Sequence, residues 1–160
     1  MPLDVAHIHL MLNHLPVIGA PLLLLLLTIG FLGGSHELVT VSLALVVGLA
    51  VATGLVYLTG EPAEELVERA PWFRKALAET HEKHATVGLV AMLVTGEAAG
   101  LALTLRRRPR AGVWLPRATW SGLVLSTLLL GWTAWSGGQI RHEEVRGAAV
   151  VRAPARGEAD

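Results

Sequence analysis

Cysteine is absent from this chain of 160 residues. Without thiols the protein can form no disulfide, no thiolate-bound iron–sulfur cluster and no covalently attached c-type haem. Haem b is not excluded, because histidine ligands are enough to hold it non-covalently. An excess of one charge is lacking as well, since 13 basic and 13 acidic residues cancel at neutral pH. This balance gives no electrostatic basis for a nucleic-acid partner.

Apolar residues, in contrast, are abundant. They make up 52% of the chain, and the mean hydropathy is +0.53. Apolar segments at about 10–32, 38–59, 85–105 and 119–139 each approach the roughly 20 residues that cross a bilayer as a helix. The sequence therefore predicts an all-α, four-helix transmembrane bundle within a membrane domain over residues 1–146. A mobile tail is expected over residues 147–160.

The first apolar segment resembles a secretory signal peptide in its position alone. No lysine or arginine precedes it, it is longer than a signal-peptide core, and His14, Pro16 and Pro21 interrupt it. We expect this segment to be retained as the first span.

The connections between the spans differ in length and charge. The first, about 33–37, is short and predicts a helical hairpin. In the second, 60–83, apolar and charged residues alternate as in two short amphipathic interfacial helices. Whether the second helix is separate or runs straight into span three stays open. The third, 106–117, carries five arginines: Arg106, Arg107, Arg108, Arg110 and Arg117. Because basic loops next to spans stay in the cytoplasm, we expect a bacterial cytoplasmic (inner) membrane protein with periplasmic termini.

Histidines gather at the opposite side of the membrane in this topology. Six of the seven lie near span ends there: His7, His9, His14, His81, His84 and His142. Imidazole is costly in lipid and is the commonest neutral metal ligand, so this convergence points to a cofactor. Spans one and three run parallel and are expected to be diagonal neighbours, an arrangement in which bundles hold haem b between imidazoles.

The first hypothesis is therefore a b-type cytochrome-like electron-transfer subunit rather than an independent enzyme. Its candidate haem-binding residues are His9, His14, His81, His84, His142 and Arg141, the last as a partner for a propionate. His14 is expected to matter most within span one, because it lies a full turn inside the apolar boundary. Partners would be the lipid bilayer, a quinol or periplasmic cytochrome, and other membrane subunits.

Two other hypotheses remain open. The first is a non-haem site for zinc, iron or manganese, which mixed imidazole and carboxylate ligands suit. Its candidate ligands are His9, His14, His81, His142, Glu64, Glu65 and Glu82. The second is a cofactor-free anchor subunit of a larger complex.

Glu97 is an ionisable residue within span three, about 12 Å from the arginine end by helix rise. Such a residue is a functional candidate by default. A proton-handling role and a protonated carboxyl bonded to a neighbouring span both remain open. Because Glu97 lies about 140° from His84 around an ideal helix, we expect the two to occupy different cavities.

Four stretches of the sequence resemble a known family: HIHLMLNHLPVIG, YLTGEPAEE, THEKH and GGQIRHEE. They are similar to segments of a group of small bacterial four-span integral membrane proteins with NHxP, TGEPAEE and GGxIRHxE motifs, whose activity is not settled. The likeness covers nearly all of the chain before its tail. It implies that the following are motif positions: His9, Asn13, His14, Pro16, Glu61, Glu64, Glu65, His81, Glu82, Arg141, His142 and Glu144. His7 and His84 do not match typical positions, which leaves the choice between His81 and His84 open.

The four-span topology is tested by reporter fusions placed after Ala111 and at the C-terminus. We expect opposite signals from the two positions, because four spans place the arginine loop and the termini on different sides. Identical signals would contradict the topology and the gathering of the histidines at one membrane face.

Overall fold

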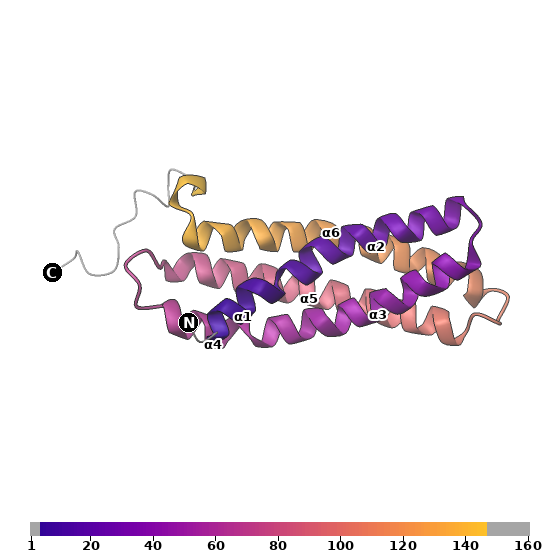
Figure 1. The fold of residues 1–160 in the computed structure, drawn as a ribbon, viewed down its shortest axis with the longest axis horizontal. Helices are drawn as coiled ribbons and strands as arrows, with labels where there is room; N and C mark the ends of the chain where they lie inside the picture. Colours follow the sequence, from indigo (N-terminus) through magenta and orange to yellow (C-terminus); the bar gives the residue numbers. More distant parts are fainter. Residues whose placement is uncertain (1–3, 147–160) are drawn as a thin grey trace.

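The computed structural model describes residues 4–146, all of whose regular structure is helical (Figure 1). The elements are α1 (Val5–Leu12), α2 (His14–Leu32), α3 (His36–Leu58), α4 (Gly60–Val67), α5 (Lys75–Thr104), α6 (Ala111–Arg141) and the short 3-10 helix η1 (Glu143–Val145). The tail predicted over residues 147–160 lies outside the described residues.

Four helical segments are long and apolar enough to cross a membrane: Val5–Leu32, His36–Val67, Lys75–Thr104 and Ala111–Arg141. The prediction of a helical chain with four helices of spanning length is thereby confirmed. The third and fourth helices begin earlier than the apolar segments did, at Lys75 and Ala111. This difference arises because hydropathy marks only the apolar part of a helix, whereas hydrogen bonding continues through its polar turns.

The ends of the helices follow from local chemistry. Asp4 caps α1 by accepting a hydrogen bond from the His7 N–H, which lowers the pKa of the Asp4 carboxyl. Ser35 caps α3 by accepting from the Leu38 N–H. Between α2 and α3, Gly34 has a φ of 64°, a left-handed conformation that suits glycine and closes the predicted hairpin.

Two helix breaks divide the histidine-bearing end from the spans. The chain bends at Asn13, between α1 and α2, and Pro16 falls in the first turn of α2, where its missing N–H is tolerated. A second break at Thr59 separates α3 from α4. α1 and α4 pack against each other across these breaks.

The connection between spans two and three contains one short helix, α4, with a single buried residue, Ala63. Within the described residues 60–83, no second short helix stands apart from the third span, because Lys75 already begins α5, one of the arrangements that the sequence left open. The interfacial position of these segments stays a prediction.

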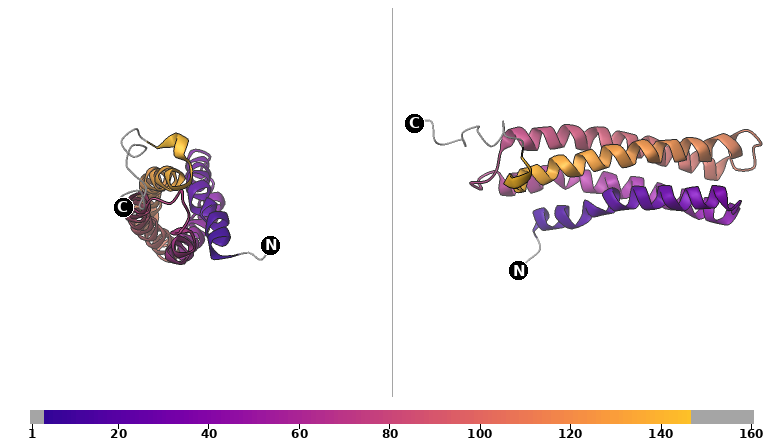
Figure 2. Two further views of the ribbon diagram at one scale, coloured as in Figure 1. Left: turned by 90° about the vertical axis from the view of Figure 1, so that its left-hand side faces the viewer. Right: turned by 90° about the horizontal axis from the view of Figure 1, so that it is seen from above.

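The long helices form a ring in which α2 packs on α3 and α6, and α5 packs on the same two helices. α2 and α5 are therefore the diagonal pair expected for spans one and three, as the view along the bundle shows (Figure 2). Leu27, Val46, Met92 and Leu123, one from each long helix, are fully buried at the centre.

Large apolar side chains also cover the outside of the bundle. Leu22, Val51, Val94 and Leu128 are each more than half exposed, as are many of their neighbours. Such continuous exposure is unfavourable in water and is expected of helices that contact lipid. The chain thus has the surface of a multi-pass membrane protein.

Close packing of α3 on α5 depends on Gly96. A side-chain carbon at this position would collide with the Cβ of Ala50, whereas a carbon at Gly131 of α6 would meet no atom within 4 Å. We expect Gly96→Ala to destabilise the protein by about 1–3 kcal/mol through overpacking. Gly131→Ala should instead be neutral or stabilise by up to about 1 kcal/mol through helix propensity.

The unfolding of both variants in detergent micelles, followed by circular dichroism, measures these effects. Equal stability of the two variants would show that α3 and α5 do not approach as closely as this packing requires.

Candidate functional site

The histidine-bearing end of the bundle brings together α1, α4, the beginning of α5 and the end of α6 (Figure 1). Its histidines come from helices far apart in the sequence. Hydrogen bonds hold two of the rings, His9 and His81, against neighbouring helices. These bonds determine which nitrogen of each ring carries the proton and which keeps a lone pair for a ligand.

His9 of α1 contacts the break between α3 and α4. Its Nδ1 lies 2.8 Å from the Thr59 Oγ1, and the Thr59 hydroxyl in turn donates to the Val56 carbonyl. Since the single hydroxyl proton is already used, the Thr59 oxygen accepts from His9 and Nδ1 carries the proton. The neutral His9 ring therefore presents an unprotonated Nε2.

His81 of α5 is oriented in the same way by α6. Its Nδ1 lies 3.0 Å from the Thr133 carbonyl oxygen and 3.4 Å from the Ser136 Oγ. A carbonyl can only accept, so Nδ1 is the donor and Nε2 keeps its lone pair. The ring approaches α6 closely because Gly137 has no side chain: a Cβ there would lie 2.9 Å from the His81 Cε1.

His84 lies one turn further along α5. Its ring packs on Trp132 of α6, with the centroids 4.3 Å apart, and its Nδ1 is buried without a hydrogen-bond partner among the described residues. Both His84 and His9 lie within electrostatic range of His81. The end of the bundle therefore assembles His9, His81 and His84 in one region.

The other predicted histidines do not join this group. His14 lies on the outer surface of α2, where its Nδ1 donates to the Leu10 carbonyl at 2.8 Å. His14 therefore does not face the His9 and His81 rings, and its expected importance within span one stays a prediction. His142 follows α6, is exposed, and pairs with Glu144 at 3.0 Å. Hydrogen bonds from its own backbone N–H and from His142 lower the pKa of the Glu144 carboxyl.

The predicted carboxylates lie beside the histidines but do not complete an ion site with them. Glu64 of α4 is half-buried and lies within electrostatic range of Glu82, Lys75 and Glu79, while Glu65 and Glu82 are exposed. Within residues 4–146, no group of three His, Cys, Asp or Glu side chains is placed to hold a metal ion.

Two arginines flank the site in different roles. Arg141, the predicted propionate partner, lies over the Trp72 ring at 4.9 Å and is exposed. Arg146 was missed by sequence reasoning, yet its side chain is only 3% exposed. It donates to the carbonyls of Gln139, Ile140 and Trp72 and to the Glu143 carboxylate. Its position just beyond the last helix, where cations satisfy free carbonyls, is the signal that marks it.

Glu97 lines a groove that none of the histidines borders, in agreement with the expectation that it and His84 occupy different cavities. Glu97 is exposed on α5, and the shallow apolar groove lies between α3 and α5, where its lining includes Val47, Val51 and Leu101. The functional group at the histidine end is thus formed without Glu97.

In comparisons with known proteins, no family model, curated protein or solved structure matches the chain. The family resemblance drawn from the motifs therefore stays a prediction.

The orientation of His81 can be tested with two adjacent glycines of α6. A Cβ at Gly137 would displace the His81 ring, whereas one at Gly138 would meet no atom within 4 Å. We expect Gly137→Ala to break the His81–Thr133 hydrogen bond and Gly138→Ala to preserve it. ¹⁵N spectra of histidine-labelled protein report the tautomer of each ring. An unchanged His81 signal in Gly137→Ala would contradict the placement of this ring against α6.

Proposed function

We propose that the protein is a membrane-embedded, b-type cytochrome-like electron-transfer subunit that holds haem b through His9 and His81. The observation that carries this proposal is the shared state of the two rings. Each donates its Nδ1–H to a fixed acceptor, at 2.8 Å for His9 and 3.0 Å for His81, and so keeps an unprotonated Nε2. This is the state in which ligating histidines are held in proteins.

The position of the two rings within the bundle also supports haem. His9 belongs to the first span and His81 to the third, which are the diagonal pair. Bundles accommodate cofactors between side chains of facing helices. The His84 Nδ1 is buried and has no partner among the described residues. Such an unsatisfied atom is costly, and a cofactor bound beside it would let the His84 ring turn to a position where this nitrogen gains a partner.

The number of ligands favours haem over a bare ion. Haem iron receives four nitrogens from the porphyrin and needs one or two axial residues, whereas structural and catalytic zinc sites take three or four protein ligands. The described residues offer a pair of oriented imidazoles and no group of three candidate ligands. The non-haem alternative therefore requires a larger rearrangement.

The two helix breaks provide a way for the site to widen. α1 and α4 pack mainly on each other and join the spans through Asn13 and Thr59. A shift of this pair would move His9 relative to His81 while the buried centre of the four long helices stays packed. Arg141, exposed over Trp72, is the cation available for a propionate.

Haem b supplies one-electron chemistry when bound, and the chain determines how that chemistry is tuned. Thr59 and the Thr133 carbonyl accept from the imidazoles and raise their basicity. The partners we propose are a quinol or periplasmic cytochrome and other membrane subunits, in a bacterial inner membrane with periplasmic termini.

The test is the absorption spectrum of protein purified from haem-sufficient cells. We expect a Soret band whose pigment is released completely by acidified organic solvent, because no cysteine can attach it. His9→Leu and His81→Leu should lose the band, and Thr59→Val should weaken haem affinity by about tenfold or more by removing the acceptor of His9.

His7→Leu is the matched control, since His7 lies on the same helix, is exposed and, among residues 4–146, bonds through its ring to Asp4 alone. It should keep the wild-type spectrum. Absence of a Soret band in the wild-type protein would refute the proposal, and a stoichiometric metal ion in that preparation would establish the non-haem alternative.

A further inference from the structure

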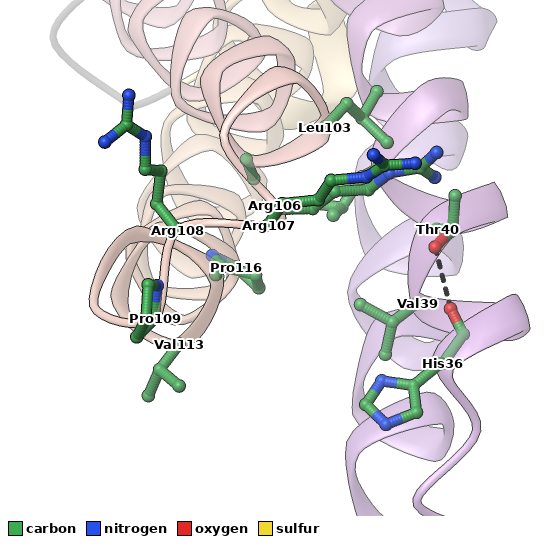
Figure 3. Close-up of a pocket in the computed structure, with 13 residues that line it drawn as sticks. His36, Val39, Thr40, Leu103, Arg106, Arg107, Arg108, Pro109, Val113 and Pro116 are labelled. Atoms are coloured by element: carbon green, nitrogen blue, oxygen red, sulfur yellow. Dashed lines mark hydrogen bonds between the residues drawn. The ribbon is translucent and has the colours of Figure 1, made fainter.

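The arginine end of the bundle contains a pocket of about 500 Å³ between α3, α5 and α6 (Figure 3). Its wall is formed by apolar residues such as Val39, Leu43 and Leu103, and its rim by His36, Arg106 and Arg107. In Figure 3 the Arg106 and Arg107 side chains extend from the end of α5 toward Thr40 and His36 of α3. Arg108 also borders the pocket but points away from it.

The charge in this pocket is unbalanced. No carboxylate lines it, and within residues 4–146 the Arg106 and Arg107 guanidinium groups form neither an ion pair nor a hydrogen bond. The Thr40 hydroxyl is not a partner, since it donates to the His36 carbonyl at 2.8 Å. Two like charges that share a pocket repel each other, and a bound anion would relieve that repulsion.

The geometry points to a binding site for a phosphate-bearing anion, to which Arg106 and Arg107 donate hydrogen bonds from one side of the pocket. Guanidinium groups match phosphate because their planar N–H donors form paired, charge-assisted hydrogen bonds with its oxygens. The pocket has the composition of the basic pockets between spans that receive lipid headgroups, with an apolar wall beside the charged rim. The phosphate can belong to an anionic phospholipid or be free in solution.

The experiment uses the full chain in nanodiscs of neutral phosphatidylcholine. One arm adds phosphatidylglycerol to the bilayer and counts retained lipids by native mass spectrometry. The other arm adds inorganic phosphate to neutral discs and measures the unfolding temperature, with chloride at equal ionic strength as the reference. Retention or stabilisation in the lipid arm alone identifies a headgroup site, and an effect in both arms identifies a site for the phosphate group itself. Either result supports the proposal, and no effect in either arm overturns it.

Two double variants separate the pocket from the general charge of the loop. Arg106→Gln/Arg107→Gln removes two charges that face the pocket. Arg108→Gln/Arg110→Gln removes two from the same loop, one pointing away and one outside the lining. We expect the first pair to weaken binding about tenfold or more, because it removes at least one charge-assisted hydrogen bond to the anion. The second should keep wild-type binding within about twofold, because it spares those bonds.

Equal weakening by both pairs would show diffuse attraction to the loop and overturn the pocket. The Arg106→Lys/Arg107→Lys variant keeps the charge, and its binding can be measured even if the glutamine variant does not fold. It should bind more weakly than wild type because it loses the paired donors. Wild-type affinity in the lysine pair would contradict recognition by guanidinium geometry.

Discussion

The satisfaction of polar groups inside an apolar environment is the constraint on which the rest of this structure depends. In lipid no water is available, so a hydroxyl or ring nitrogen is stabilised by a partner within the protein. Thr28, Ser42, Thr53, Thr95 and Thr119 all donate to the carbonyl four residues earlier in their own helices. The same requirement orients His9 and His81, whose Nδ1 atoms have acceptors and whose Nε2 atoms are therefore left free, whereas the buried His84 Nδ1 has no partner among the described residues. The need to satisfy polar groups inside the membrane therefore also determines which imidazole nitrogen can bind a ligand.

The sequence was sufficient for those features that depend on composition and periodicity. Apolar length predicted four helices of spanning length, and span order predicted that α2 and α5 are diagonal. It was insufficient for the partner of each ring. An ideal helix places His9 and His14 about 140° apart, on different faces. That angle does not tell which face meets another helix: His9 contacts Thr59, whereas His14 is exposed and bonds to the Leu10 carbonyl of its own segment.

The remaining differences come from contacts across the sequence that have no local signal. A glycine such as Gly137 either ends a helix or admits a bulky neighbour, and only the structure shows that the neighbour is the His81 ring. Arg146, the last residue of the predicted membrane domain, carries no sequence signal of burial, yet it is buried and donates to the Trp72 carbonyl. Sequence spacing correctly indicated which end of the bundle carries the histidines. Only the packing of α5 on α6 shows which of them has a neighbour close enough to orient its ring.

The two ends of the bundle have different chemistry. At one end the His9 and His81 rings each keep an unprotonated Nε2, and Glu64 of α4 lies within electrostatic range of Glu82 of α5. At the other, Arg106 and Arg107 have no counter-charge in the described part of the chain. An anion held between these arginines would fix the arginine end at the headgroup level while leaving the histidine end unaffected. At the histidine end, α1 and α4 contact each other more than they contact the long helices that they continue. If the proposed cofactor binds there, this pair of short helices is the part of the bundle whose movement disturbs the buried centre least.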